Sequence, residues 1–367
     1  MKNHIQTALV RNILFACVFV AGCSSTKPIP VRILKPATVT MPGIKSISII
    51  DFEVTEGLDK MSGTEAARKL NAALVANGHF EMVEGWKAKA ALSAIAEEEG
   101  REIAALGVTD YQKVGKEIGA NAVIFGSVGI YSSNDTWKKS KREIKEKVDG
   151  KTQKRKIEEA VVTRTARVGI TFRVVDVQKG IVLASLSKTA EAEDVKAQEI
   201  EEKSGFLGGI SKLRGALGKE ASPEEKAKVL ATANLLPPNI LLDRALANLS
   251  DIIVQNIAPH YVNESRIIQK GKHQLMKSGY DFALRDLWDD SKEAWLSVTE
   301  NSGATSDHPQ AWYNLGVYHE LEGNLDEAEK NFKTAYNLKP EELYLDAKAR
   351  IRKRKEEMER LQEQKIN

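Results

Sequence analysis

The stretch TARVGITFRVVDVQKGIVLASLSKT, residues 165–189, determines the fold of the larger part of this chain. Apolar side chains recur there at every second position: Val168, Ile170, Phe172 and Val174. A period of two is expected of a strand with one buried face. Asp176 and Gly180 are typical turn residues, and a second apolar run follows them. The stretch therefore predicts two antiparallel strands joined by a tight turn.

The residues before this stretch predict alternating strands and helices. Strands are expected at 44–54, 79–85 and 121–131, and helices at 61–78, 86–106 and 110–120. Gly78 would end the first helix and Asp110 would cap the third. Strands that alternate with helices favour a mixed sheet covered by helices. We expect one α/β domain over residues 44–260.

Four stretches then suggest a family. ISIIDFE, HFEMVE, VGKEIGANAVIFGSV and ITFRVVDVQKGIVLAS occur in this order from residue 47 to residue 185. They resemble the curli-secretion lipoprotein family (CsgG-like), and residues 237–257 are similar to its terminal helix. The resemblance implies an α/β domain, an N-terminal lipid anchor and a secretion channel of several copies, in which two segments become membrane-spanning hairpins. These motifs are strand cores and turns, so they specify fold better than function.

The first segment that would span the membrane, residues 132–163, is highly charged. Asp149-Gly150 predicts a type I′ turn, so the segment is expected to be a β-hairpin. One face would carry Lys139, Lys141, Lys145, Lys147, Lys151 and Arg155, and the other Lys138, Arg142, Lys154 and Lys156. A base that faces lipid at the bilayer midplane costs about 2–4 kcal/mol. We therefore expect a solvated, protruding hairpin. The alternative is a basic arm that binds an acidic partner or anionic lipid headgroups.

The second such segment is GFLGGISKLRGALGKE, residues 205–220. Its apolar and basic residues suggest an amphipathic stretch that could lie in a membrane interface. Its glycines disfavour a helix by up to about 1 kcal/mol each. A loop that packs on the α/β domain is the alternative.

The C-terminal stretch AWYNLGVYHELEGNLDEAEKNFKTAYNLKP, residues 311–340, resembles a tetratricopeptide repeat (TPR). The matching positions are Trp312, Leu315, Gly316, Gly323, Ala328, Phe332, Ala335 and Pro340. Gly316 and Ala328 are small, which suggests a close approach of two helices there. Pro340 would end the second helix. We expect an all-α TPR-like segment at 264–367 with one clear repeat at 309–342, a degenerate repeat before it and a charged capping helix after it.

In TPR proteins the first helix of each repeat lines a partner-binding groove, which implies a protein-binding role for this segment. The corresponding positions are Gln310, Tyr313, Val317 and Glu320. A scaffold without a ligand is the alternative interpretation.

The N-terminus has Lys2 and Arg11 before a short apolar run, which is typical of a signal peptide over residues 1–22. The run ends in VAGC, which resembles the lipobox of bacterial lipoproteins and implies lipid attachment at Cys23. Ser24 then implies the outer membrane. Residues 23–43 contain four prolines and are expected to form a tether. A secretory peptide followed by a buried cysteine is the alternative.

Composition and motifs argue against catalysis. The net charge of +3 over 367 residues gives no footprint for nucleic acid. The six histidines are scattered, and no phosphate loop, nucleophile elbow or metal-ligand spacing occurs. Asp51 and Glu53 follow a buried strand, where active-site carboxylates often lie in α/β folds, but an acidic pair at the end of a strand is more often a plain loop start.

Together these patterns predict a non-enzymatic lipoprotein, anchored in the outer membrane and facing the periplasm, with no metal or cofactor. It would serve as a scaffold or adapter for envelope assembly or secretion through protein–protein contacts. The alternative is an oligomeric component of a curli-like secretion channel, and the family resemblance leaves homo-oligomerisation open.

Overall fold

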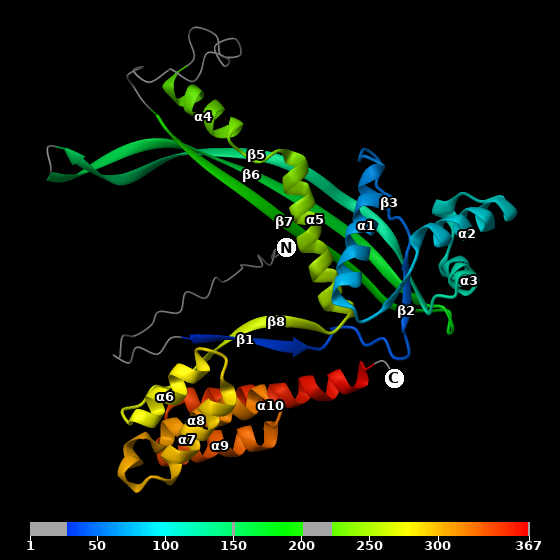
Figure 1. Ribbon diagram of the computed structural model, residues 1–367. Helices are drawn as coiled ribbons and strands as arrows, with labels where there is room; N and C mark the ends of the chain where they lie inside the picture. The colour runs from blue at the N-terminus through cyan, green and yellow to red at the C-terminus, as the bar shows by residue number, and fades with distance from the viewer. Residues whose placement is uncertain (1–27, 149–150, 201–221, 366–367) are drawn as a thin grey trace, which may run out of the picture. The chain divides into compact units, whose positions relative to one another are not determined.

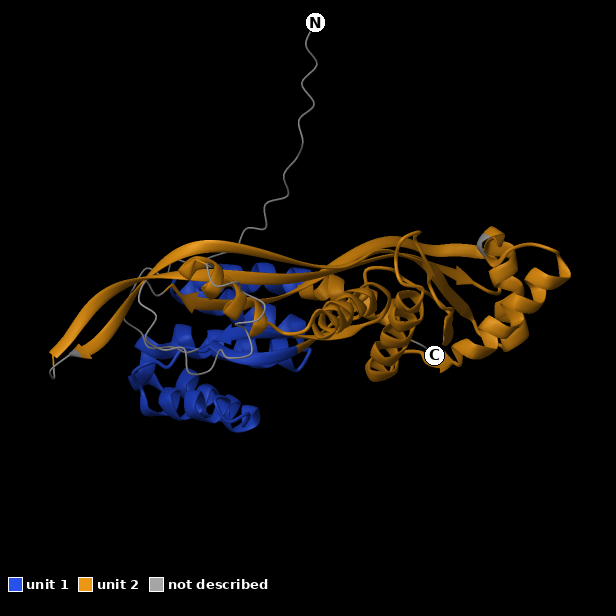
Figure 2. Cartoon of the chain, turned by 90° about the horizontal axis from the view of Figure 1, so that it is seen from above, with its two compact units in different colours: residues 1–32, 263–353 blue, residues 33–262, 354–367 orange. Residues whose placement is uncertain are grey.

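A computed structural model describes residues 28–148, 151–200 and 222–365 (Figure 1). The chain divides into two compact units (Figure 2). Unit 1 consists of residues 1–32 and 263–353, and unit 2 of residues 33–262 and 354–367. Unit 2 is built on a β-sheet with flanking helices, whereas unit 1 contains the helical segment. The predicted succession of a mixed α/β region and a helical region is confirmed.

The sheet of unit 2 has the strand order β4-β2-β5-β6-β7, with β3 beside β5. β2 pairs in parallel with β4 and β5, whereas β5, β6 and β7 are antiparallel. The strands are β2 (Ser46–Ile49), β3 (Glu53–Val54), β4 (Glu81–Val83), β5 (Ala122–Val148), β6 (Lys151–Asp176) and β7 (Ile181–Glu199). Parallel strands need crossover connections, and helices supply them before β4 and β5.

Helices cover both faces of this sheet. The helices of unit 2 within residues 33–262 are α1 (Met61–Asn77), α2 (Gly85–Glu98), η1 (Ile103–Ala105), α3 (Val108–Ile118), α4 (Pro223–Ala233) and α5 (Pro238–Ile257). One core joins α1 and α5 to Ile47, Ile124 and Phe172. A second core joins α2 and α3 to Val123 and Val177. Neighbouring strand residues enter different cores because side chains alternate across a sheet.

The predicted turns are present, with one correction. Gly78 ends α1 with φ 73°, and Gly180 has φ 67° in the turn between β6 and β7. Asp176 Oδ1 accepts a hydrogen bond from the backbone of Lys179 at 2.9 Å. Asp110 is not the first cap of α3, because the helix begins earlier and Gly107 is its N-cap residue. The Asp110 carboxylate instead accepts from the Gly107 N–H at 2.8 Å, and this bond helps to hold its pKa below the usual value against the effect of burial.

The predicted tether is partly a strand. β1 (Pro28–Lys35) pairs with β8 (His260–Ile267) in a two-stranded sheet. Ile29, Val31 and Ile33 are buried, whereas Pro28 and Pro30 occupy exposed positions between them. Prolines are tolerated at a strand edge, so their presence did not exclude a strand. The start of the expected degenerate repeat is also a strand. Residues 264–267, where we expected a helix, belong to β8.

Unit 1 contains successive packed helices. They are α6 (Gln274–Ala283), α7 (Trp288–Glu300), η2 (Ser302–Asp307), α8 (His308–Leu321), α9 (Leu325–Leu338) and the first part of α10 (Glu342–Glu363). α6 packs on α7, α7 on α8, and α8 on α9. The clear repeat at 309–342 corresponds to α8 and α9, and α9 ends just before Pro340 as the sequence predicted.

The end of α10 belongs to unit 2 and is partly buried: Glu357, Leu361 and Gln364 are buried, whereas Glu359 and Arg360 between them are exposed. Glu357 accepts hydrogen bonds from Lys35 Nζ at 3.0 Å. Gln364 accepts from the backbone N–H of Ala37 at 2.8 Å and donates to its carbonyl at 3.0 Å. Leu361 is buried beside these contacts. A charged composition alone could not show that residues 34–37 supply partners for this helix end.

Several predicted features lie outside the described residues. These are the signal peptide at 1–22, the lipidation site Cys23, the Asp149-Gly150 turn and the segment 205–220. Among the helices of the described ranges, none has the length and apolar composition to cross a membrane.

Two glycines of β5 offer a direct test of the sheet packing. A Cβ atom on Gly126 would meet the Thr171 carbonyl oxygen and lie 2.7 Å from Cα of Phe172, so the neighbouring strand would have to move. A Cβ atom on Gly129 would find only the Thr55 hydroxyl, at 3.9 Å. We expect Gly126→Ala to lower the free energy of unfolding by about 1–3 kcal/mol. Gly129→Ala should change it by much less. Urea denaturation of both variants measures this, and equal stabilities would contradict the assigned register.

Candidate functional site

The helix face that the TPR resemblance assigned to a partner is closed. Among its four residues, Tyr313 is 1% exposed, Val317 0% and Glu320 3%. Gln310 is half-buried. Three of the four predicted groove positions are therefore in the interior of unit 1 and cannot contact a partner. The groove prediction is wrong for these residues.

Other parts of unit 1 occupy this face of α8. The Tyr313 ring contacts the rings of Phe332 and Tyr344, with centroids 5.5 and 5.2 Å away. Asn314 and Gln269 exchange two hydrogen bonds, of 2.9 and 2.7 Å. Burial raises the pKa of Tyr313 to about 12, which keeps its hydroxyl neutral. The chain itself thus fills the space that a bound peptide would take in a longer repeat array.

Glu320 is the centre of a buried ionic cluster. It accepts hydrogen bonds from Arg266 at 2.7 and 3.0 Å, and from Arg350 at 2.8, 2.9 and 3.1 Å. Arg266 also forms an ion pair with Glu264 at 2.8 Å. Two acids and two bases balance each other, which is the arrangement that a buried charge requires. The cluster connects α8 to β8 and α10 and has a structural role.

The remaining repeat residues pack largely as their positions suggest. Those that are buried are Leu315, Gly316, Ala328, Phe332 and Ala335. Trp312 is half-buried and Pro340 is exposed after α9. The close approach at Gly316 is to the Phe332 ring, which a Cβ atom there would meet at 2.6 Å. The sequence suggests a close approach at the two small residues Gly316 and Ala328, and the structure adds the Phe332 ring as the neighbour of Gly316.

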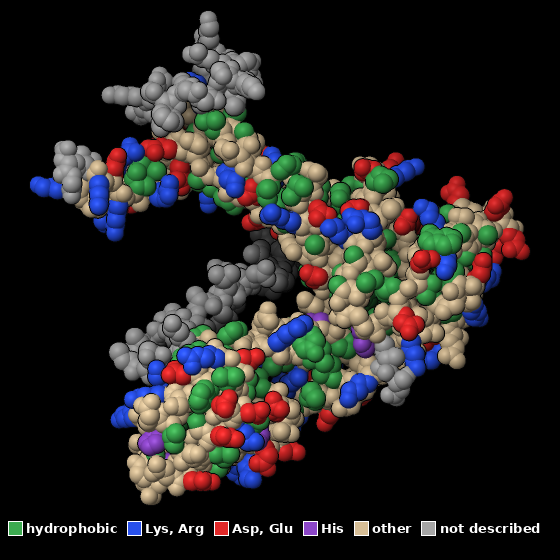
Figure 3. Space-filling model, in the orientation of Figure 1, with side chains coloured by type: hydrophobic (Ala, Val, Ile, Leu, Met, Phe, Trp, Pro, Cys, Tyr) green, Lys and Arg blue, Asp and Glu red, His purple; other side chains and the backbone are tan. Residues whose placement is uncertain are grey.

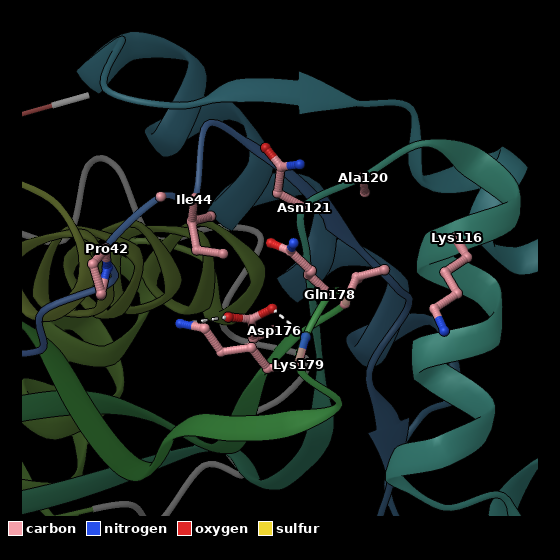
Figure 4. A pocket seen from close by; sticks show the side chains of 10 residues that line it. Pro42, Ile44, Lys116, Ala120, Asn121, Asp176, Gln178 and Lys179 are labelled. Atoms are coloured by element: carbon pink, nitrogen blue, oxygen red, sulfur yellow. Dashed lines mark hydrogen bonds and ion pairs between the residues drawn. The ribbon is translucent and has the colours of Figure 1, made fainter. Parts of the chain in front are cut away.

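Unit 2 contains an open cleft of about 400 Å³ between the loop before β2, the end of α3 and the β6–β7 turn (Figure 4). Its polar groups are largely engaged in structural bonds. Asn121 Oδ1 accepts from the backbone of Lys45 and Ser46 at 3.1 Å. Asp176 accepts from the backbone of Lys179 and forms an ion pair with its ammonium group at 3.5 Å. This cleft has no arrangement of acid, base and nucleophile.

The two catalytic candidates from the sequence, Asp51 and Glu53, are not part of this cleft. Asp51 Oδ2 accepts from Thr64 Oγ1 at 3.1 Å and from Lys89 Nζ at 2.9 Å, and so connects α1 to α2. Glu53 is an exposed residue of β3. Within the described residues, no group of His, Cys, Asp and Glu is arranged to hold a metal ion.

The most prominent exposed feature of unit 2 is an arm, which we define as residues 132–148, 151–163 and 192–199 of β5, β6 and β7. β5 and β6 stay paired from Ala122–Asp176 to Val148–Lys151. β7 follows β6 only as far as the pair of Glu199 with Glu159. From Lys141 to Val148 the arm is therefore a two-stranded ribbon, roughly 24 Å long at the usual rise per residue.

The base of the arm is fixed by α4 and the segment after it. Val162 packs with Ala231 and Leu235 in a small buried cluster. Lys228 Nζ lies 5.0 Å from the centre of the Trp137 ring. These contacts hold α4 against the strands where the arm begins.

Ion pairs add to this attachment. Arg164 binds both carboxylate oxygens of Asp135 at 2.7 Å and donates to the Leu236 carbonyl at 2.8 Å. The Asp194 carboxylate accepts from the Leu236 N–H at 2.7 Å, which lowers its pKa. These bonds position the arm relative to the core of unit 2.

Cross-strand ion pairs continue along the ribbon. Glu158 pairs with Lys139 at 2.6 Å and Lys141 at 3.2 Å, and the hydrogen bonds from these lysines lower its pKa. The further pairs are Arg142–Glu159 at 3.1 Å, Lys154–Glu143 at 2.8 Å, Arg155–Glu146 at 3.7 Å and Arg155–Glu199 at 2.9 Å. Each described acid of residues 138–159 thus has a basic partner.

The register corrects the two faces that we assigned from the sequence. Lys145 lies opposite Lys154, and Val148 opposite Lys151. Opposite residues of an antiparallel pair share a face. One face therefore carries Lys139, Lys141, Lys145, Lys147, Lys154 and Lys156, and the other carries Lys138, Arg142, Lys151 and Arg155. Bases still occur on both faces, so the expectation of a protruding charged hairpin agrees with the structure.

Comparison with known proteins gives one family match. Residues 277–363, from α6 into α10, match a domain of unknown function (DUF6340). No curated protein matches the chain. The family match covers less than half of the chain and assigns no activity.

Solved structures that are similar include several bacterial proteins. A PelC dodecamer from Paraburkholderia phytofirmans is 13% identical, with 62% of this chain and 98% of that chain covered and a TM-score of 0.26. The LpoB C-terminal domain from Salmonella enterica is 14% identical, with 42% and 86% covered and a TM-score of 0.24. Lipoprotein GNA1162 from Neisseria meningitidis is 15% identical, with 47% and 94% covered and a TM-score of 0.25. At these values the similarity establishes neither the function nor the oligomeric state of this chain.

Removing the charge of Glu320 should destabilise unit 1. Glu320→Gln leaves Arg266 and Arg350 with a neutral acceptor in a buried place, which we expect to lower the free energy of unfolding by about 3–5 kcal/mol. Glu322→Gln, two residues further along and exposed, is the matched control and should change it by less than about 0.5 kcal/mol. Thermal and urea unfolding followed by the near-ultraviolet signal would measure both. A fully stable Glu320→Gln variant would contradict the structural role of the cluster.

Proposed function

We propose that this chain is an outer-membrane lipoprotein, anchored through Cys23 and facing the periplasm, that acts as a non-enzymatic adapter in envelope assembly or secretion. The observation that carries the proposal is the arm of unit 2. It extends three strands beyond the core of its unit and exposes charged side chains on both faces. Such a feature adds contact surface without adding a site for chemistry.

The internal bonds of the chain support a binding role. The Glu320 cluster, Asp51 and the polar groups of the cleft mainly serve structural contacts between elements. An enzyme needs polar groups that remain available for its substrate. In this chain the polar groups that remain available are the exposed charged side chains of the arm, which suits a protein that acts by binding partners.

A partner of the helical unit would have to contact its outer side, since the inner face of α8 is filled. Leu284 and Leu287 are exposed between α6 and α7 and give this side some apolar character. Exposed apolar residues are common contacts in protein interfaces. The TPR-like segment can therefore still contribute to an adapter, although not through the groove that its sequence suggested.

A second candidate function is an oligomeric component of a curli-like secretion channel. The long β5–β6 hairpin favours it, since the family resemblance places a membrane-spanning hairpin here. The charges argue against it. Each base that faced midplane lipid would cost about 2–4 kcal/mol, and bases occupy both faces. A ring of copies could still form through soluble parts of unit 2.

Replacement of the proposed lipid attachment residue tests the anchor. We expect Cys23→Ser to abolish incorporation of labelled fatty acid and to release the protein from the outer-membrane fraction, because several acyl chains are needed for stable anchoring. Cys17→Ser, within the proposed signal peptide, is the control and should be lipidated normally. If the unmodified chain takes up no labelled fatty acid, the anchor is excluded.

Reconstitution separates the adapter from the channel. When purified lipidated protein is added to planar bilayers, we expect no stable conductance, whatever its oligomeric state. In outward-facing proteoliposomes of neutral phosphatidylcholine, trypsin should cut between Lys138 and Lys156. Steady single-channel currents together with protection of this hairpin would reject the adapter and support the channel.

A further inference from the structure

The ribbon of the arm contains more basic side chains than its ion pairs can neutralise. Residues 138–159 contain ten bases and five acids. The bases with an ion pair to a described acid are Lys139, Lys141, Arg142, Lys154 and Arg155. Lys138, Lys145, Lys147, Lys151 and Lys156 have none within the described part of the chain. The surplus charge is therefore carried by lysines.

Three of these lysines lie at the end of the arm, and we call Lys145, Lys147 and Lys151 the tip lysines. All three are exposed. Lys145 is directly opposite Lys154, and Lys151 is opposite Val148 on the other face. Figure 3 shows basic side chains gathered at this end of the arm. Of the three, Lys145 alone faces a like charge across the ribbon, and Lys154 on that side is paired with Glu143 at 2.8 Å. The charge of the tip lysines is therefore exposed and available to an anion outside the fold.

The chemistry of the tip indicates what kind of anion this is. The two guanidinium groups of the ribbon, Arg142 and Arg155, are already engaged with carboxylates. Guanidinium matches carboxylates and phosphates in two-point geometry, whereas an ammonium group acts as a point charge. The free groups of the tip are ammonium groups, so they favour a ligand that presents many negative charges without a fixed geometry, as a layer of lipid phosphates does.

The geometry also favours a surface over a small ligand. The tip lysines are exposed and lie on both faces of a narrow ribbon, so they do not converge on one bound ion. An object that meets the ribbon end-on can contact lysines from both faces at once. A layer of lipid headgroups meets this condition, and attraction to such a layer needs no fixed geometry.

We propose that the tip lysines bind the phosphate groups of an anionic membrane surface. This goes beyond the adapter role, because it gives the end of the arm a ligand of its own. The binding is peripheral and electrostatic, and no strand enters the lipid. It depends on the number of ammonium groups at the tip and weakens as salt screens them.

Vesicle flotation tests the proposal on the full chain carrying Cys23→Ser, so that no acyl chain contributes. Vesicles of phosphatidylglycerol and phosphatidylethanolamine in equal parts are compared with vesicles of phosphatidylcholine. Each lysine near such a surface contributes about fivefold to partitioning. The variant Lys145→Gln, Lys147→Gln, Lys151→Gln should therefore bind the anionic vesicles on the order of 100-fold more weakly. Neutral vesicles should bind both chains equally and weakly.

The matched control removes the same charge elsewhere in unit 2. Lys45, Lys60 and Lys116 are exposed and far from the arm in sequence. The variant Lys45→Gln, Lys60→Gln, Lys116→Gln should bind anionic vesicles within a few fold of the parent chain. Equal weakening by both triple variants would overturn the proposal, since only net charge would then matter. Unchanged binding by the tip variant would also overturn it.

Two competitors distinguish other sources of the anion. Inorganic phosphate should displace the chain no more than chloride at the same ionic strength, and stronger displacement would make free phosphate the ligand. Polyglutamate is the second competitor. If it bound the parent chain as tightly as the anionic vesicles do, and did not bind the tip variant, the ligand of the tip would be an acidic protein. Both results would overturn the membrane assignment. The acyl-labelling test of Cys23 is independent, so failure of the tip proposal leaves the anchor standing and the reverse also holds.

Discussion

The antiparallel pairing of β5 with β6 is the interaction on which most of unit 2 depends. It runs from the pair of Ala122 and Asp176 to the pair of Val148 and Lys151, with a single irregularity between Val128 and Ile130. The inner half of this pairing supplies both cores of the sheet, because successive residues enter opposite faces. The outer half has only the small cluster of Val162 with Ala231 and Leu235, and beyond it ion pairs connect the strands. One continuous ladder thus changes from a hydrophobic structure to an electrostatic one along its length.

This change explains why the arm can be both exposed and ordered. Exposed single ion pairs contribute little, typically 0 to about 1 kcal/mol each. In the arm they add to a backbone ladder that is already anchored in the core, and α4 covers the position where the third strand is about to end. The described acids of the ribbon are all used in this way. Lys145, Lys147 and Lys151 have no ion pair among the described residues, so exposed positive charge remains near the tip.

Unit 1 shows how a TPR-like sequence can close on itself. A single repeat cannot bury its own inner face, so another part of the chain must cover it. Here Tyr344 of α10 and Gln269 after β8 take that position, and the Glu320 cluster joins the same elements by charge. The hydrogen bonds from Arg266 and Arg350 satisfy the Glu320 carboxylate, which a free groove would present to a ligand. The repeat pattern thus predicts the helix pair correctly but not its use.

The sequence by itself determined the elements whose signals are local. The alternation at Val168 to Val174, the turn at Gly180, the end of α1 at Gly78 and the helix pair before Pro340 could all be read from neighbouring residues. Only the tertiary structure decided what depends on distant partners. It paired β1 with β8, buried the α8 face, and set the register that places Lys154 on the face of Lys145 and Lys151 on the face of Arg142. The physical reason is that a period shows which side of an element is buried, whereas the group that covers that side comes from elsewhere in the chain.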